Sequence, residues 1–422
     1  MDRRGFLFAG GVLLGSAWWL RPADQGRPYS DYFRKLNRQL RQQGPGRPLM
    51  LIDVPRLDHN IERIQKMRPA HQDFRIVAKS LPCPALLARI MQAMSTRRLM
   101  VFHQPQILAL AQQFPDSDLL LGKPMPIQAC ADTYRRWPQA CKFQPERQLS
   151  WLIDTPERAQ QYAQLARQWG LNMKVSLEID VGLHRGGLAS PAALEPILPL
   201  LSSAGGPLHL QGFMGYDAHV GKIPALIESR SRSLQGSQAS YRAFQETLYR
   251  LAPVYREQTL VMNGAGSPTF RWHDSHSPLN EVSAGSAFVK ASDFDLDVLA
   301  DLQPAVWIAT PVLKASDGLH LPGIEKTGGL WPLWDLNRRR SYFIYGGEWR
   351  AHPVSPAGLQ GNPLYGYSSN QDLLNGSQAT GLRVDDQVFF RPTQSEELML
   401  EFGDLAAIQA DGRIDYWPVL PG

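Results

Sequence analysis

The feature that most constrains the fold is an alternation of short apolar runs with amphipathic stretches between residues 49 and 288. The runs have the length and composition of buried β-strands, and segments between them, such as Pro84 to Met94 and Pro156 to Trp169, carry apolar residues at helical spacing. Repeated strand–helix alternation predicts a parallel sheet. The number of units predicts an α/β fold with a closed (β/α)8 barrel of the TIM type.

Nine such runs are present, one more than an eight-stranded barrel uses. Their spacing alone does not identify the extra one. The nine runs are Leu49 to Asp53, Arg75 to Lys79, Leu99 to Phe102, Asp118 to Leu121, Ser150 to Ile153, Lys174 to Asp180, His209 to Phe213, Leu260 to Asn263 and Val282 to Phe288.

After Asp295 the pattern changes to short strand-like runs interrupted by Gly, Pro and Asn. Examples are Ala305 to Leu313, Ser341 to Tyr345 and Gln387 to Phe390. This texture predicts a C-terminal β-rich domain over 296–422. An apolar fraction of 43% and a charged fraction of 20% are ordinary for a folded globular protein and argue against a polytopic membrane protein.

Nucleic-acid binding is not expected. The formal charge of +5 is spread along the chain, and the Arg338-Arg339-Arg340 cluster has no DNA- or RNA-reading motif around it. The three cysteines have no zinc-site spacing, and they cannot all pair with one another. In an oxidising compartment, Cys130 and Cys141 are the candidate disulfide.

The N-terminus predicts export. Arg3 and Arg4 directly precede an apolar, Gly-rich run from Gly5 to Leu20, an arrangement that resembles a twin-arginine signal. A run of roughly 16 residues is short for a membrane span. We therefore expect a signal over 1–25 and a periplasmic or otherwise exported protein, with a retained N-terminal anchor as the alternative.

Reactive groups in barrel enzymes lie at the C-terminal ends of the strands. The run Arg75 to Lys79 ends in a lysine that would point into the barrel mouth, where partial desolvation favours the neutral, nucleophilic amine. A solvated lysine that opens a surface loop is the alternative, because most lysines are exposed.

Two Gly-rich loops follow strands late in the predicted barrel. One contains Asn263-Gly264-Ala265-Gly266-Ser267, and the other contains Ser283-Ala284-Gly285-Ser286. Glycines let backbone N–H groups approach an anion closely, and the hydroxyls add donors. Each loop alone is compatible with a plain turn, but two loops at adjacent late strand ends predict a phosphate site.

Two further strand ends carry an arginine, an aromatic ring and a histidine. Arg185 follows the run Lys174 to Asp180, and Tyr216 and His219 follow the run His209 to Phe213. A guanidinium can hold a phenolate oxygen, and a flat ring can stack on an aromatic cofactor. A surface salt bridge for Arg185 and a hydrogen-bonded core position for His219 are the alternatives.

Taken together, the lysine after the first barrel strand, the Gly-Leu-His-Arg-Gly-Gly segment, the Gly-Tyr-Asp-Ala-His segment and the Asn-Gly-Ala-Gly-Ser-Pro-Thr loop resemble the alanine-racemase-like pyridoxal-phosphate enzymes of fold type III. The closest resemblance is to the D-threonine aldolase and D-serine dehydratase branch, including amino acid deaminase/aldolase proteins. It covers nearly all of the chain after the signal.

The resemblance implies pyridoxal 5′-phosphate as cofactor, with Lys79 as the Schiff-base lysine. It implies that Leu49 to Asp53 is the surplus strand and belongs to the β domain, so that residues 26–53 form a linker and joining strand and residues 54–295 form the cofactor-binding barrel. Arg185 matches the group at the cofactor's phenolic oxygen, and Tyr216 and His219 match groups beside the ring. The phosphate cradle and its neighbours match Asn263, Gly264, Gly266, Ser267, Ser283, Gly285 and Ser286.

The sequence departs from the family in two places. Alanine racemases carry an arginine against the pyridine nitrogen, in the strand that here contains Glu281 and Ser283. The aldolase and dehydratase branch carries a His-x-Cys metal pair, whereas the corresponding stretch here is Phe390-Arg391-Pro392-Thr393-Gln394-Ser395. Without an imidazole or thiolate ligand in that stretch, no metal site is expected.

Together, these expectations predict a lyase that acts on a small, D-configured β-hydroxy amino acid. The lyase would be either an aldolase or a dehydratase. The alternatives are an amino acid racemase and a non-catalytic protein that binds the cofactor. A second acid or base is expected from His219, His103 or His352, because imidazole titrates near neutral pH. The family resemblance also implies a homodimer.

Overall fold

The computed structural model describes residues 21–138, 140–224, 226–318 and 334–421. The chain divides into two compact units. Among the described residues, the barrel unit takes its members from 55–305, 394–404 and 417–421, and the β-rich unit from 21–54, 306–318, 334–393 and 405–416. The boundaries expected from the sequence differ from this division, because the segment 394–404 and the last residues of the chain join the barrel unit.

The barrel unit is a closed sheet of eight parallel strands, in which β2 also pairs with β9. The fold class predicted from the sequence is therefore confirmed. The strands are β2 (Asp73–Val77), β3 (Arg98–Val101), β4 (Asp118–Leu121), β5 (Leu149–Ile153), β6 (Met173–Glu178), β7 (Leu208–Met214), β8 (Val261–Gly264) and β9 (Glu281–Ala284). Each matches one of the predicted runs within a few residues.

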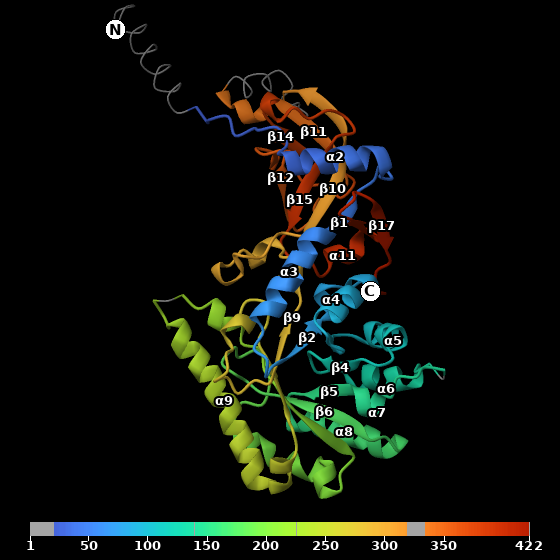
Figure 1. Cartoon of the computed structure of the whole chain (residues 1–422), viewed down its shortest axis with the longest axis vertical. Helices are drawn as coiled ribbons and strands as arrows, with labels where there is room; N and C mark the ends of the chain where they lie inside the picture. Colours follow the sequence, from blue (N-terminus) through green and yellow to red (C-terminus); the bar gives the residue numbers. More distant parts are fainter. Residues whose placement is uncertain (1–20, 139, 225, 319–333, 422) are drawn as a thin grey trace, which may run out of the picture. The chain divides into compact units, whose positions relative to one another are not determined.

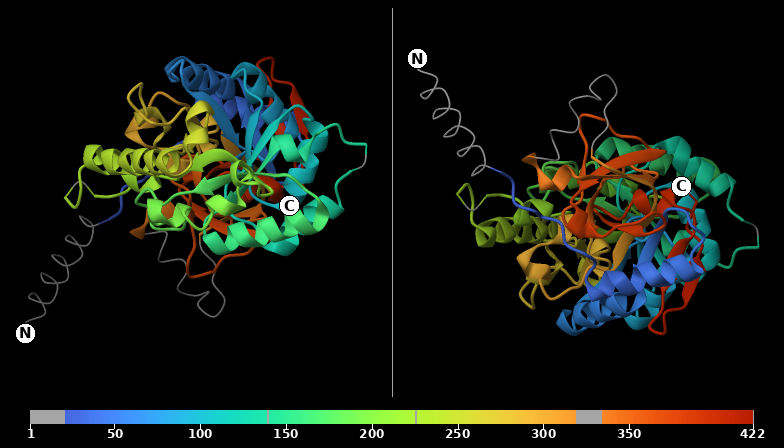
Figure 2. Two further views of the ribbon diagram at one scale, coloured as in Figure 1. Left: turned by 90° about the horizontal axis from the view of Figure 1, so that it is seen from below. Right: turned by 90° about the horizontal axis from the view of Figure 1, so that it is seen from above.

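Helices surround these strands (Figures 1 and 2). Helix α8 illustrates how the local sequence sets the ends of a helix. At its start, the Thr155 hydroxyl accepts a hydrogen bond from the Arg158 N–H, and Pro156 is the first helical residue. At its end, Gly170 adopts the left-handed conformation. The helices are α3 (Val54–Met67), α4 (Pro84–Ala93), α5 (Gln104–Gln113), α6 (Ile127–Arg135), α7 (Pro145–Gln148), α8 (Pro156–Trp169), α9 (Arg230–Leu251) and α11 (Leu398–Glu401).

Two crossovers depart from the strand–helix pattern. Between β8 and β9, the 3₁₀ turn Phe270–Trp272 replaces an α-helix. Between β6 and β7, three short 3₁₀ turns replace an α-helix: Pro191–Leu194, Leu198–Leu200 and Ser202–Ala204. Prolines and a Gly-Gly pair in this segment interrupt an α-helical hydrogen-bond ladder.

The β-rich unit holds a nine-stranded sheet. Strand β1 (Leu49–Asp53) pairs with β10 and β16 in this sheet, so the surplus run belongs to the β domain. The other strands are β10 (Val306–Asp317), β11 (Arg340–Tyr345), β12 (Ala351–Ser355), β13 (Gln360–Gly361), β14 (Gln371–Gly376), β15 (Gln387–Pro392), β16 (Leu405–Ile408) and β17 (Ile414–Trp417). Helix α2 (Asp31–Gln43) buries Leu36 and Leu40 in a cluster with Trp307 and Phe389.

The expected disulfide between Cys130 and Cys141 is not formed, because all three cysteines are free. Cys130 is fully buried on α6, where burial raises the pKa of its thiol, and the thiol of Cys141 donates a hydrogen bond to the Ala111 carbonyl instead. Among the described residues, no helix is long and apolar enough to cross a membrane. The predicted signal over 1–25 lies outside the described residues up to Leu20.

Candidate active site at the mouth of the barrel

Lys79 lies at the C-terminal end of the first barrel strand. It belongs to the 3₁₀ turn Ala78–Ser80, directly after β2. Its side chain lines two cavities of the barrel unit, of about 570 Å³ and about 650 Å³. The amine lies 4.9 Å from the centre of the Phe102 ring, and its nitrogen is 2.7 Å from a carboxylate oxygen of Glu396. A lysine in a cavity at this end of the strands is accessible to a small ligand.

The two Gly-rich loops meet at the larger cavity. The Ser267 hydroxyl accepts hydrogen bonds from the backbone N–H groups of Gly285, at 3.3 Å, and Ala287, at 3.0 Å. In the structure both N–H groups donate to the Ser267 oxygen, so rotation of the Ser267 side chain would be needed to free them as donors for an anion. A Cβ atom at Gly285 would lie 2.7 Å from the Val77 carbonyl oxygen, so a larger residue does not fit there. Six of the seven residues predicted for the phosphate cradle and its neighbours line this cavity: Asn263, Gly266, Ser267, Ser283, Gly285 and Ser286.

Arg185 and Tyr216 face each other at the larger cavity, with the guanidinium carbon 5.0 Å from the centre of the Tyr216 ring. Burial raises the pKa of Tyr216, and the charge of Arg185 opposes that rise. The loop that carries Arg185 is shaped by the Asp180 carboxylate, which accepts hydrogen bonds from the N–H groups of Gly182 and His184. Gly264 lies beneath this surface, packed against Leu279 and the Tyr241 hydroxyl.

The three predicted histidines lie in different surroundings. His103 lines the smaller cavity, where burial and the charge of Lys123 lower the pKa of its imidazole. His219 packs against Gly182 and is absent from the residues that line the two described cavities; burial lowers its pKa. His352 is exposed on β12 of the β-rich unit. Of the three predicted histidines, His103 is therefore the one that shares a cavity with Lys79.

Two carboxylates at neighbouring strand ends were not predicted as site residues. Glu178 ends β6 and Asp154 follows β5, and both line the smaller cavity. Burial and the nearby charge of Asp154 raise the pKa of Glu178 to about 7, although Arg185 opposes the rise. Glu178 could have been predicted, because it lies near the C-terminal end of the run Lys174 to Asp180, where reactive groups of barrel enzymes are found.

Glu396 was also not predicted, and it comes from a segment that the sequence assigned to the β-rich domain. The neighbouring Ser395 is fully buried and donates a hydrogen bond to the Ser80 carbonyl, and the Gln394 amide donates one to Asp293. No group of three or more potential metal-ligating residues occurs in the described part of the chain. Of the stretch Phe390 to Ser395, the last two residues, Gln394 and Ser395, thus belong to the barrel unit and are hydrogen-bonded to it.

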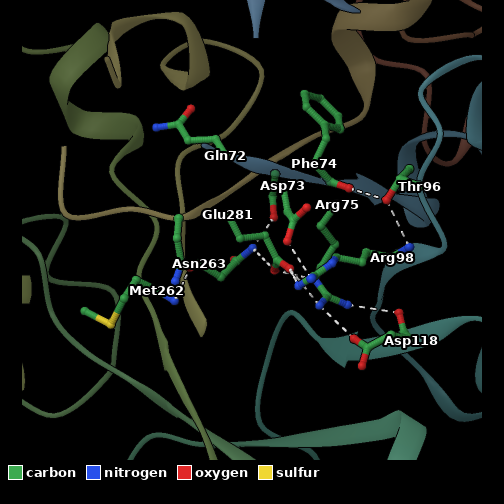
Figure 3. Close-up of polar contacts among 12 residues, drawn as sticks. Gln72, Asp73, Phe74, Arg75, Thr96, Arg98, Asp118, Met262, Asn263 and Glu281 are labelled. Carbon is green, nitrogen blue, oxygen red and sulfur yellow. Dashed lines mark hydrogen bonds and ion pairs between the residues drawn. The ribbon is translucent and has the colours of Figure 1, made fainter. Parts of the chain in front are cut away.

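A buried charge network lies at the opposite, N-terminal ends of the strands (Figure 3). The fully buried Arg75 bonds Glu281 at 2.6 Å and Asp118 at 2.7 Å. Burial acts to raise the pKa of Glu281, but the adjacent arginines outweigh it and lower that pKa. The Asn263 amide donates to both Glu281 and Ser283 at 2.7 Å. The network therefore fixes two residues, Asn263 and Ser283, that line the larger cavity.

These residues fit pyridoxal 5′-phosphate. The larger cavity combines a primary amine from Lys79, the backbone N–H and hydroxyl donors around Ser267, and a ring next to a guanidinium at Tyr216 and Arg185. The amine suits the aldehyde, the donors suit the phosphate, and the guanidinium suits the phenolic oxygen. The individual roles stay predictions from the sequence.

The family described as alanine racemase, N-terminal domain, matches residues 52–293. A D-threo-3-hydroxyaspartate dehydratase from a Delftia species is 17% identical, with a TM-score of 0.66 over 89% of this chain and 97% of that chain. A D-threonine aldolase from Filomicrobium marinum is 14% identical, with a TM-score of 0.66 over 89% and 97%. An alanine racemase from Clostridium difficile is 14% identical, with a TM-score of 0.65 over 87% and 98%.

No curated protein matches the chain. At these identities the solved structures show a shared fold of barrel and β-rich domain, which agrees with the two units described above. The family match covers more than half of the chain, and it spans the segment with Lys79 and both Gly-rich loops. The chain therefore belongs to the alanine racemase N-terminal domain family, the alanine-racemase-like proteins of fold type III, and its cofactor is pyridoxal 5′-phosphate.

Proposed function

We propose that this protein is a pyridoxal-phosphate-dependent lyase that cleaves or dehydrates a small, D-configured β-hydroxy amino acid. The observation that carries the proposal is the position of the Lys79 amine, which borders both the cavity lined by the predicted phosphate-binding residues and a second cavity large enough for an amino acid. The fold shared with a D-threo-3-hydroxyaspartate dehydratase and a D-threonine aldolase supports this reaction class.

Bound pyridoxal phosphate would supply an electron-accepting ring that stabilises negative charge on the substrate. The residues of the chain would hold the cofactor and move protons. Lys79 would bind the cofactor covalently and, once displaced by the amino group of the substrate, act as a base. Ser267 and the N–H groups of Gly285 and Ala287 would hold the phosphate, and Arg185 and Tyr216 would orient the ring.

A leaving hydroxyl or a carbon–carbon bond cleavage also needs an acid or a base on the substrate side. His103 and Glu178 both line the smaller cavity, as Lys79 does. The pKa of about 7 at Glu178 means that part of the population is protonated near neutral pH and part can accept a proton. We propose these two residues, rather than His219, as the second acid–base pair of the site.

We propose that the reaction needs no metal ion bound to the protein. Gln394 donates to Asp293 and Glu396 pairs with Lys79, so the polar groups of this segment already have partners within the barrel unit. An amide oxygen and one carboxylate are also weak ligands for the soft or borderline metals that histidine and cysteine bind. Chelator-treated protein should keep its turnover, and restoration by added Mn²⁺ or Zn²⁺ would count against the proposal.

The activity is tested by incubating the holoprotein with a panel of D- and L-amino acids that includes β-hydroxy amino acids. Release of a keto acid or an aldehyde supports the lyase. The Lys79→Ala protein should lose this activity, whereas Lys66→Ala, which removes a surface lysine paired with Glu62, should keep it. Formation of the opposite enantiomer would favour the racemase alternative, and no product from any substrate would favour a protein that only binds the cofactor.

We also propose that the protein is exported and acts as a homodimer. Export rests on Arg3 and Arg4 before the apolar run, and the dimer rests on the family resemblance. Fractionation of the native host should recover the protein outside the cytoplasm, and an Arg3→Lys, Arg4→Lys variant should stay inside. A single monomeric species across the working concentration range, measured by light scattering, would reject the dimer.

A further inference from the structure

Lys79 has one ion-pair partner within the described part of the chain, the carboxylate of Glu396. The Lys79 nitrogen and the Glu396 Oε1 atom are 2.7 Å apart, which is hydrogen-bond distance. The two side chains are 39% and 30% exposed, so water reaches the pair but does not separate it. Both residues line both cavities. The carboxylate of Glu396 therefore lies beside the Lys79 amine in both cavities.

Hydrogen bonds of Glu396 and of the two residues before it hold Glu396 in this position. Its Oε1 atom accepts a hydrogen bond from the Ser80 hydroxyl at 3.3 Å. The residue before it, Ser395, is fully buried and donates to the Ser80 carbonyl at 2.8 Å. Gln394 donates to Asp293 at 3.0 Å. Three hydrogen bonds thus fasten this short segment to the barrel next to the turn that carries Lys79.

The chemistry of Lys79 requires a change of protonation. An ammonium group has no free electron pair, so it must lose a proton before it attacks a carbonyl carbon, and it must regain one after it is displaced. A carboxylate within hydrogen-bond distance can take and return that proton. The face of the Phe102 ring, 4.9 Å from the nitrogen, favours the charged amine and offers no acceptor of this kind.

We propose that Glu396 is the proton partner of Lys79, an inference that rests on the proposed function. When the amine attacks the cofactor aldehyde, an N–H bond of Lys79 breaks and an O–H bond forms on Glu396. The nitrogen electron pair forms the new C–N bond. The carbonyl oxygen then leaves as water, with one proton from the nitrogen and one from Glu396, and the carboxylate is regenerated. When a substrate amino group displaces Lys79, the substrate ammonium would give a proton to Glu396, and Glu396 would pass it to the released Lys79 amine, so that the carboxylate is again regenerated.

Other titratable groups also face Lys79, and they define the background of the test. On the smaller cavity they are His103, Lys123, Asp154, Glu178, Arg185 and Glu397. On the larger cavity they are His184, Tyr216, Lys222 and Asp293. All of these are unchanged in a Glu396→Gln variant, which keeps the size of the side chain and removes only its charge and its capacity to accept a proton. A difference between that variant and the wild type therefore reports on Glu396.

The test uses three variants, each compared with wild type. Glu396→Gln removes the proton acceptor, Glu396→Asp keeps a carboxylate, and Glu401→Gln removes an exposed carboxylate from the same segment as a control. In cofactor-free protein, the rate at which Lys79 reacts with an acylating reagent is measured by mass spectrometry across a pH series. Loss of the nearby anion should change the dependence of the acylation rate on pH in Glu396→Gln, with Glu401→Gln unchanged.

The second measurement adds pyridoxal phosphate to cofactor-free protein and follows the yellow colour of the covalent link. At pH values where the acylation rates of both proteins no longer rise, Glu396→Gln should form the link about tenfold more slowly than wild type, and Glu396→Asp should recover part of the rate. Unchanged pH profiles and unchanged rates in Glu396→Gln would overturn the proposal. A profile shift with an unchanged rate would reduce Glu396 to an electrostatic role and would also reject the proton transfer.

The proposed function can fail separately. If borohydride traps no cofactor on Lys79 in wild type, the cofactor role of Lys79 is rejected, whatever the acylation profile shows. If the link forms and the profiles differ as expected, but no amino acid is turned over, then Glu396 remains the proton partner and only the lyase activity is rejected.

Discussion

At the scale of single residues, carboxylates account for much of the candidate site that sequence patterns did not predict. Lys79 and the Gly-rich loops were predictable because each follows a strand with a recognisable apolar run. Glu396 was not, because its contact with Lys79 joins residues 317 positions apart, 396 minus 79, and no local pattern connects them. Arg75 and Glu281 belong to barrel strands and form a buried ion pair. A buried charge needs an ionic partner, and the sequence does not show which residue that partner is.

Glu178 gives a prediction for pH and stability. Burial and Asp154 raise its pKa to about 7 from the ordinary value of 4.5, so between these values the folded state binds more protons than the unfolded state. The free energy of unfolding should therefore fall as the pH rises through this window. Relative to wild type, Glu178→Gln should be more stable at about pH 8 by on the order of 2 kcal/mol and nearly equal at about pH 4.5.

Urea unfolding of both proteins at the two pH values measures this difference. The matched control is Glu157→Gln, which removes an exposed carboxylate from the first turn of α8. A stability difference between Glu178→Gln and wild type that is the same at both pH values would show that Glu178 has an ordinary pKa.

At the scale of elements, the sequence predicted strands better than the connections between them. All eight barrel strands follow predicted apolar runs, because most residues of a strand that is buried on both faces are apolar. The β6 to β7 crossover formed 3₁₀ turns that periodicity did not predict. The segment 394–404 was assigned to the β-rich domain because its composition resembles its neighbours, and its attachment to the barrel depends on hydrogen bonds to Ser80 and Asp293.

Substitution of two glycines in the barrel unit compares a tightly packed loop position, Gly285, with an exposed helix position, Gly236. A Cβ atom at Gly285 would lie 2.7 Å from the Val77 carbonyl oxygen and 2.9 Å from the Ser80 Cβ, beside the turn that carries Lys79. Gly285→Ala should therefore lose about 1–3 kcal/mol of unfolding free energy and retain cofactor poorly on dialysis. Gly236 lies in α9 with nothing within 4 Å, so Gly236→Ala should gain about 0.5–1 kcal/mol.

Thermal or urea unfolding of the two variants, with absorbance of the retained cofactor, measures both effects. Equal and small changes in stability for the two substitutions would contradict the packing described for Gly285.

At the scale of the whole molecule, the family match and the two units account for the fold. The barrel and the β-rich unit were both expected from the change of sequence texture near Asp295. Sequence patterns also led to the cofactor, because the ordered motifs around Lys79, Arg185 and Ser267 are shared with a family that uses it. The bond that is broken depends on the placement of acids and bases such as His103 and Glu178, which no motif encodes.

The central claim is that Lys79 carries the cofactor, and borohydride reduction of the intact holoprotein tests it most directly. Reduction should fix a pyridoxyl group on the peptide that contains Lys79, as found by mass spectrometry of a proteolytic digest, and the Lys79→Ala protein should be neither yellow nor labelled. An unlabelled Lys79 in wild type, or a Lys79→Ala protein that keeps a covalently bound cofactor, would contradict the account.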